Sequence, residues 1–208
     1  MSIEQMDYQL FHAINEWART APMLHPLIRF LAKDAFYIFF IGLLAYWFVR
    51  KGNHRKMVIE AAVSLCIGLA FSWILGHLFY RDRPFVAHAV LQLIDHPVNA
   101  SFPSDHALGA FVIATSIGIY RRKEGILWWI LAALIAISRV WAGVHYPTDI
   151  IGGAIIGILV AFGVHSAVSR SRLLSRCMLG CIQIYETFEA KIWPGSKRKE
   201  QKSAAQGK

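Results

Sequence analysis

The chain has 208 residues, of which 56% are hydrophobic and 17% are charged, and its mean hydropathy is positive. This composition excludes an ordinary soluble domain and favours helices that lie in a bilayer. The net charge of +9 does not indicate a nucleic-acid-binding surface, because the basic residues occur in short runs between apolar stretches.

Ahead of the first long apolar stretch, apolar residues recur at helical spacing, at Ile3, Met6, Leu10, Ile14 and Trp17. Pro22 and Pro26 then interrupt the chain. We predict an interfacial or re-entrant pair of helices in this segment. A sixth membrane span is the less favoured alternative, because Asn15, Glu16 and Arg29 would be costly in hydrocarbon.

Five apolar stretches of spanning or near-spanning length follow, and each predicts a transmembrane helix. Their approximate bounds are residues 35–49, 57–79, 107–120, 126–144 and 150–168. The first and the third are short, but polar residues at their outer ends can extend them. The predicted fold class is all-α: a polytopic membrane helical bundle with five to six spans.

Lysine and arginine residues gather at alternate ends of these stretches. They fill the links at residues 50–56 and 121–123, and they follow the last stretch from Arg170 onward. The positive-inside rule then predicts that these links and the C-terminus are cytoplasmic. The extracytoplasmic side receives the link at residues 80–103 and the turn at residues 145–149, which hold most of the unusual polar residues.

Beyond the last span, apolar residues again recur at helical spacing, at Leu174, Met178, Cys181, Ile182, Tyr185, Phe188 and Ile192. They predict an amphipathic helix on the cytoplasmic surface. We expect one membrane-embedded domain at residues 1–194, with its motifs at residues 77–149, and a basic, disordered cytoplasmic tail at residues 195–208.

Three polar clusters interrupt the outer ends of otherwise apolar helices. They are Arg83-Pro84, then Pro103-Ser104-Asp105-His106, then Ser138-Arg139 followed by His145 and Asp149. Ionisable residues at membrane depth are costly unless they are paired or line a polar cavity. Their convergence on one side of the membrane therefore predicts a functional site.

The residue types in these clusters favour a phosphoryl group as the ligand. Arg83 and Arg139 offer guanidinium donors that match phosphate oxygens, and Ser104 can add a hydroxyl donor. As the predicted N-cap of an apolar helix, Ser104 would also lie beside free backbone N–H groups that face the same anion. Together these groups predict an anion site.

The same clusters contain a candidate nucleophile and a candidate acid. His145 lies just before a helix that we expect to begin at Pro147, and Asp149 lies in the first turn of that helix. The Asp149 carboxylate can therefore hold one imidazole nitrogen and leave the other free to attack phosphorus. His106 remains as the general acid, because the pKa of histidine suits proton donation near neutral pH.

In this order the motifs R-P, P-S-x-H and S-R-x5-H-x3-D resemble the signature of the type 2 phosphatidic acid phosphatase superfamily. The sequences R-P-F-V-A-H and P-S-D-H are most similar to the bacterial undecaprenyl pyrophosphate phosphatases of the bacitracin-resistance kind. This resemblance implies an enzyme of the bacterial plasma membrane that converts undecaprenyl diphosphate to undecaprenyl phosphate on the outer face and recycles the cell-wall lipid carrier.

The resemblance also assigns roles to individual residues. It implies that His145 is the nucleophile that forms a phosphohistidine, Asp149 its orienting partner and His106 the acid. It makes Arg83, Ser104 and Arg139 the phosphate ligands.

The chain departs from the family pattern at Gly76, where the family has Lys, and at Asp105, where it has Gly. We expect His77 or Arg81 to supply the missing charge. Asp105 is expected to pair with an arginine or to be favoured near the helix start.

We expect no metal or other cofactor, because Arg83 and Arg139 would repel a cation. The expected partners are an isoprenoid lipid diphosphate as substrate and membrane lipids, without nucleic acid. Phosphatidic acid and phosphatidylglycerophosphate are alternative substrates, since the motifs do not encode the lipid tail. A non-catalytic lipid-phosphate binder or flippase is the alternative from another class, although it would have no use for the pair of His145 and Asp149.

Three residues outside the motifs carry simpler expectations. His88 and His96 in the external link are expected to be solvated loop residues. Glu60 is expected to extend to the membrane surface or to pair with Lys56, one helical turn earlier.

Overall fold

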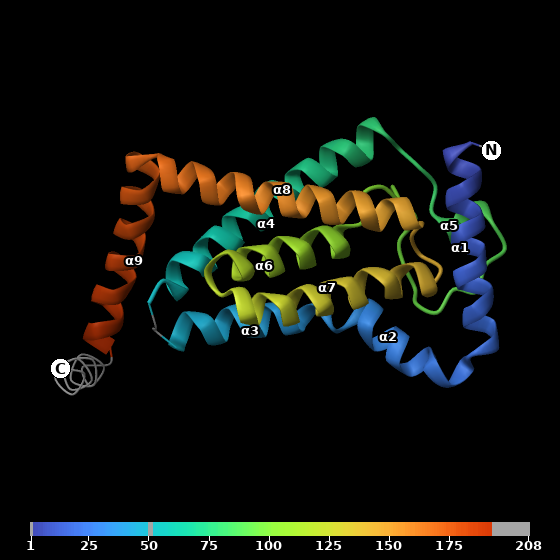
Figure 1. Cartoon of the computed structure of the whole chain (residues 1–208), viewed down its shortest axis with the longest axis horizontal. Helices are drawn as coiled ribbons and strands as arrows, with labels where there is room; N and C mark the ends of the chain where they lie inside the picture. The colour runs from blue at the N-terminus through green and yellow to red at the C-terminus, as the bar shows by residue number, and fades with distance from the viewer. Residues whose placement is uncertain (1, 50–51, 193–208) are drawn as a thin grey trace. The chain divides into compact units, whose positions relative to one another are not determined.

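The computed structural model describes residues 2–49 and 52–192, and every regular element in these ranges is a helix (Figure 1). The chain divides into two compact units, Met1–His165 and Ser166–Lys208. The first unit holds α1 to α7 and most of α8, and the second holds the end of α8 together with α9. The predicted all-α fold class is confirmed.

Each of the five predicted apolar stretches corresponds to one helix. These are α3 (Phe36–Val49), α4 (His54–Leu78), α6 (Asp105–Tyr120), α7 (Arg122–Trp141) and α8 (Pro147–Arg170). Helices α4, α7 and α8 are long and apolar enough to cross a membrane, whereas α3 and α6 are apolar but shorter. The protein is therefore membrane-integral.

Helix α6 is the central helix of the first unit. It packs against α4 and α7 and lies between them in Figure 1. Every residue from Ala107 to Ile117 is buried, as expected for a helix that is apolar on all its faces. The start of α6, which follows Ser104, consequently lies inside the protein.

Helix α8 lies against α6 through two glycines that are one turn apart. A Cβ atom on Gly153 would lie 2.6 Å from the carbonyl oxygen of Ser104, and one on Gly157 would lie 2.5 Å from that of Leu108. These distances are too short for nonbonded atoms, so glycine permits a backbone approach that a larger residue would prevent. The two glycines thereby fix the start of α8 next to the start of α6.

The N-terminal segment consists of α1 (Ile3–Thr20), the short 3-10 helix η1 (Pro22–Leu24) and α2 (His25–Lys33). Helix α1 is not among the helices that are apolar enough to span a membrane. Its apolar stripe faces outward, with Ile3 79% and Trp17 60% exposed, which suits a helix at a membrane interface.

The opposite face of α1 is buried against the rest of the first unit. The Asn15 side chain donates to the carbonyl oxygens of Leu91, at 2.9 Å, and Trp141, at 3.2 Å, and it accepts from the Leu91 N–H at 2.9 Å. A polar residue that would be costly in hydrocarbon therefore serves to attach α1 to the loop after α5 (Pro84–Ala87) and to the end of α7.

The predicted C-terminal amphipathic helix is confirmed as α9 (Arg172–Ile192), and the predicted tail at residues 195–208 lies outside the described residues. The expected pairing of Glu60 is wrong. Glu60 is buried, so its partner comes from α8 rather than from its own helix: its Oε2 lies 2.9 Å from Nδ1 of His165.

The packing of α8 predicts that Gly157→Ala destabilises the protein whereas Gly163→Ala does not. A Cβ atom on Gly163 would meet no atom within 4 Å, although the residue lies on the same helix. We expect Gly157→Ala to lower the free energy of unfolding by about 1–3 kcal/mol, as overpacking does. Gly163→Ala should leave it unchanged or raise it by up to about 1 kcal/mol. Thermal unfolding in detergent, followed by circular dichroism, measures both; equal effects would contradict the packing account.

Candidate active site

The turn between α7 and α8 brings the third polar cluster together. Gly143 has a φ of +79°, and a Cβ atom there would lie 2.5 Å from the carbonyl oxygen of Leu91. Only glycine suits both conditions. The chain then reverses, and α8 begins at Pro147 as predicted. His145 consequently lies in the turn, directly ahead of the N-terminus of α8.

His145 is buried between a cation and a carboxylate. Its Nε2 lies 3.0 Å from Nη1 of Arg83, and its Nδ1 lies 3.4 Å from Oδ2 of Asp149. Burial lowers the pKa of His145 well below its usual value, and the charges of Arg83 and Arg139 lower it further. The imidazole is therefore neutral at neutral pH, which is the state a nucleophile or a proton acceptor requires.

Asp149 is fully buried and is fixed by hydrogen bonds from its own segment and from the preceding loop. Its Oδ2 accepts from the Ser101 hydroxyl at 2.5 Å and from the Tyr146 N–H at 2.8 Å. The predicted reach of this carboxylate back over the first turn of α8 is confirmed. These bonds hold Oδ2 beside the imidazole.

Arg83 is buried, and the described groups that accept its hydrogen bonds are backbone carbonyls and a side-chain amide rather than carboxylates. Its guanidinium donates to Asn99 Oδ1 at 2.9 Å, to the Val144 carbonyl at 2.9 Å and to the Ala100 carbonyl at 3.1 Å. Burial lowers its pKa to about 10, so the group remains charged at neutral pH. Arg83 is thus a fixed cation beside His145.

Arg139 carries unused donors in a buried position. It is 1% exposed, and its Nη1 donates to the Ala32 carbonyl of α2 at 2.5 Å. Its Nε and Nη2 are buried and have no hydrogen-bond partner among the described residues. Buried donors are almost always paired in proteins, so two open donors on one guanidinium indicate a place for an anion.

The second motif lies at the start of α6. Ser104 is the N-cap, as predicted, and its hydroxyl accepts from the Ala107 N–H at 3.5 Å. His106 packs on the Phe36 ring, with centroids 5.5 Å apart, and lies within electrostatic range of Arg139 and His145. The structure therefore brings the second and third motifs together.

Asp105 belongs to the first turn of α6 and accepts a hydrogen bond from the hydroxyl of Ser72 on α4. Of the two expectations for this residue, the helix start is the one that the structure bears out. His77, by contrast, is exposed, and its Nδ1 lies 2.7 Å from the carbonyl oxygen of Trp73. Both side chains line a pocket of about 410 Å³ beside the site.

Arg81 contacts Asp149 at the carboxylate oxygen that does not face His145. Its Nη1 lies 3.5 Å from Oδ1 of Asp149 and 2.7 Å from Oδ2 of Asp7. The same Nη1 donates to the Thr148 hydroxyl at 2.9 Å, and the guanidinium lies 3.6 Å from the centroid of the Tyr146 ring. Arg81 is therefore held mainly by carboxylates and an aromatic face.

Asp7 of α1 is a site residue that the motifs do not predict. Besides the contact with Arg81, it accepts from the Thr148 N–H at 3.0 Å and from the Thr148 hydroxyl at 2.6 Å. The signal in the sequence is faint: Asp7 lies two helical turns before Asn15, so the two form a polar stripe on one face of α1.

His88 and His96 lie in the link at residues 80–103, as expected, but they are partly buried and each faces another ring. The His88 ring lies 4.1 Å from the Tyr8 ring, and the His96 ring lies 6.0 Å from that of His145. Burial lowers the pKa of His96 to about 4. The loop containing both residues folds back over the site because Asn15 anchors it at Leu91.

Comparison with known proteins gives relatives of similar length. The bacitracin transport permease protein BcrC of Bacillus licheniformis is 34% identical over 204 residues, which cover 98% of each chain. The undecaprenyl-diphosphatase BcrC of Bacillus subtilis (strain 168) is 34% identical over 157 residues, or 76% of this chain and 81% of that protein.

A solved structure has the same fold. The crystal structure of Aquifex aeolicus LpxE matches with a TM-score of 0.67 and 26% sequence identity, over 80% of this chain and 99% of that one. The family model of the PAP2 superfamily matches residues 57–173, a range that includes all three motifs. The chain therefore belongs to the PAP2 superfamily of phosphatases, the superfamily that its three motifs predict.

Proposed function

We propose that the protein hydrolyses undecaprenyl diphosphate to undecaprenyl phosphate and phosphate and thereby recycles the cell-wall lipid carrier. The observation that carries this proposal is a neutral, buried His145 beside two buried arginines, one of which has two open donors. This arrangement suits the terminal phosphoryl group of the substrate. The identity to a Bacillus undecaprenyl-diphosphatase supports the choice of lipid.

In the first step, Nε2 of His145 attacks the terminal phosphorus. The N–P bond forms, and the bond to the bridging oxygen breaks. Asp149 holds Nδ1–H and so stabilises the positive charge that develops on the ring; the present 3.4 Å is a separation that can shorten when substrate binds. Arg83, Arg139 and Ser104 bind the equatorial oxygens of the transferred group.

The leaving lipid phosphate requires a proton, which His106 supplies. The diphosphate brings negative charge into the field of the nearby arginines, and this charge favours the protonated imidazole of His106. In the second step His106 accepts a proton from water, water attacks phosphorus, and the N–P bond of the phosphohistidine breaks. Inorganic phosphate leaves, and His145 is again neutral.

We further propose that no metal ion takes part. Two fixed guanidinium charges already occupy the positions from which a cation would neutralise the phosphate oxygens. Such a pair would also repel a divalent cation.

The proposal places the reaction on the extracytoplasmic side of the bacterial plasma membrane. Helix α6 begins at the site and ends at the basic link formed by Arg121, Arg122 and Lys123, so the link and the site lie at opposite ends of the bundle. The positive-inside rule favours a cytoplasmic location for that link and for the C-terminus.

The pocket of about 410 Å³ suits the approach of the isoprenoid chain. Trp73, Tyr80 and Phe102 supply aromatic walls, and Asn99, which accepts from Arg83, lines the same pocket. A lipid chain along these walls would lead its phosphates to Arg83.

The central test measures phosphate release by the purified protein from undecaprenyl diphosphate, phosphatidic acid and phosphatidylglycerophosphate, with and without EDTA. We expect undecaprenyl diphosphate to be preferred, EDTA to have no effect and His145→Ala to abolish turnover. His106→Gln should lower the rate by about 10²- to 10⁴-fold, because it removes general acid–base catalysis. Preference for another lipid would overturn the proposed identity of the substrate. Turnover by His145→Ala would overturn the proposed mechanism.

The low pKa of His145 predicts its titration behaviour. Because the pKa is lowered, the ring of the free protein should remain neutral from about pH 8 to about pH 5.5, a range that brackets the usual value of about 6.5. NMR of ¹³C-labelled histidine side chains measures this, and the His145 signal is the one missing from His145→Gln. A midpoint near pH 6.5 would contradict the neutral, buried state.

The contacts of Asp7 predict that it positions the site without touching substrate. Asp7→Asn should lower kcat by up to about a hundredfold, because Arg81 and Thr148 would no longer hold the first turn of α8 in place, while KM changes little. Glu4→Gln is the matched control, since Glu4 is an exposed acid on the same helix. A loss of folded protein without a kcat effect in the surviving fraction would instead indicate a purely structural role.

A further inference from the structure

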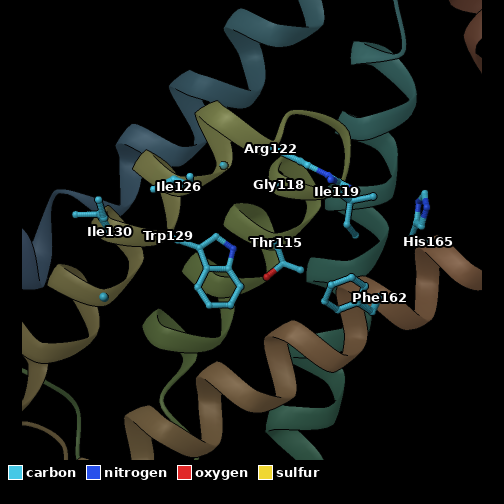
Figure 2. A pocket seen from close by; sticks show the side chains of 11 residues that line it. Thr115, Gly118, Ile119, Arg122, Ile126, Trp129, Ile130, Phe162 and His165 are labelled. Atoms are coloured by element: carbon cyan, nitrogen blue, oxygen red, sulfur yellow. The ribbon is translucent and has the colours of Figure 1, made fainter.

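A groove lies near the C-terminal end of α6, whereas the active site lies at the N-terminal end of that helix (Figure 2). It has a volume of about 950 Å³ and is formed by α6, α7 and α8. Its apolar walls include Ile126, Trp129, Ile130 and Phe162. Ile126, Ile130 and Phe162 are each more than half exposed, so the groove is open on the outer surface of the bundle.

Two glycines shape the floor of the groove. A Cβ atom on Gly125 would lie 2.4 Å from the Cα of Gly118, so the backbones of α6 and α7 are in contact there. A Cβ atom on Gly118 would lie 3.8 Å from Nε1 of Trp129. The indole N–H thus lies beside a floor that carries no side chains.

The groove also contains one buried polar group that lacks a partner in the described part of the chain. Thr115 is 2% exposed, and its buried hydroxyl has no hydrogen-bond partner among residues 2–49 and 52–192. Thr115 and Trp129 lie on either side of the same space in Figure 2. Since buried hydroxyls are usually paired, this one indicates a ligand with a polar group.

Arg122 brings a positive charge to the groove. The nearest carboxylates are already engaged: Glu60 pairs with His165, and Glu124 accepts from Arg121 at 2.6 Å. Arg122 lines the groove and forms no ion pair within the described part of the chain. An anion beside Arg122 would therefore meet an uncompensated cation.

We propose that this groove binds an anionic phospholipid such as phosphatidylglycerol. Its phosphodiester contacts Arg122 at the rim, and one acyl chain lies along Trp129, Ile130 and Phe162. A free anion would leave these apolar walls uncovered, whereas a lipid covers them and satisfies the arginine. The groove lies on two helices long and apolar enough to span the membrane, so lipid reaches it directly. This second lipid site is separate from the proposed reaction.

The test measures lipid retention by native mass spectrometry after transfer from nanodiscs that contain equal amounts of phosphatidylglycerol and phosphatidylcholine. The wild-type protein should retain one phosphatidylglycerol in preference to phosphatidylcholine. Arg122→Gln should lower that preference by about fivefold, the contribution of one basic residue near an anionic lipid. Lys123→Gln is the matched control, because Lys123 is an adjacent exposed cation that does not line the groove. It should retain the preference.

A second variant tests the apolar wall of the groove without changing the charge of the protein. Trp129→Phe retains an aromatic wall but removes the N–H, and it should weaken retention of both lipids. Equal losses in Arg122→Gln and Lys123→Gln would reduce the effect to general surface charge and overturn the site. Equal retention of phosphatidylcholine by the wild-type protein would also overturn the site. Displacement of the retained lipid by one equivalent of undecaprenyl phosphate would overturn it too.

Discussion

Two guanidinium groups are buried near each other, and no carboxylate of residues 2–49 and 52–192 forms an ion pair with either; the rest of the site depends on this constraint. Within the described part of the chain, Arg83 donates to carbonyl and amide oxygens and to His145, and Arg139 donates to one carbonyl. Such an arrangement is unfavourable in a membrane protein unless an anion completes it. The polar geometry around the arginines therefore suits an anion, which would balance their charge.

Burial and the same positive field together determine the state of the histidine. Burial disfavours a charge on His145, and the charges of Arg83 and Arg139 disfavour it further, so the imidazole stays neutral. Ser101 and the Tyr146 N–H donate to Oδ2 of Asp149, and these bonds hold that oxygen beside the imidazole. The two arginines therefore both favour an anion and help to keep His145 neutral.

Sequence rules recovered the features that local physics determines. The helix start at Pro147, the cap at Ser104 and the reach of Asp149 over one turn each involve residues a few positions apart. The contact of Asp7 with Thr148 spans 141 residues, and the pairing of Glu60 with His165 spans 105. No periodicity reports which of many polar residues will meet over such separations, because tertiary packing selects the partner.

The two departures from the family motifs meet in one place. Gly76 and Asp105 line the same pocket. A Cβ atom on Gly76 would lie 3.3 Å from the Cβ of Ala100, whose carbonyl accepts from Arg83. Glycine consequently lets α4 approach the loop that holds Arg83.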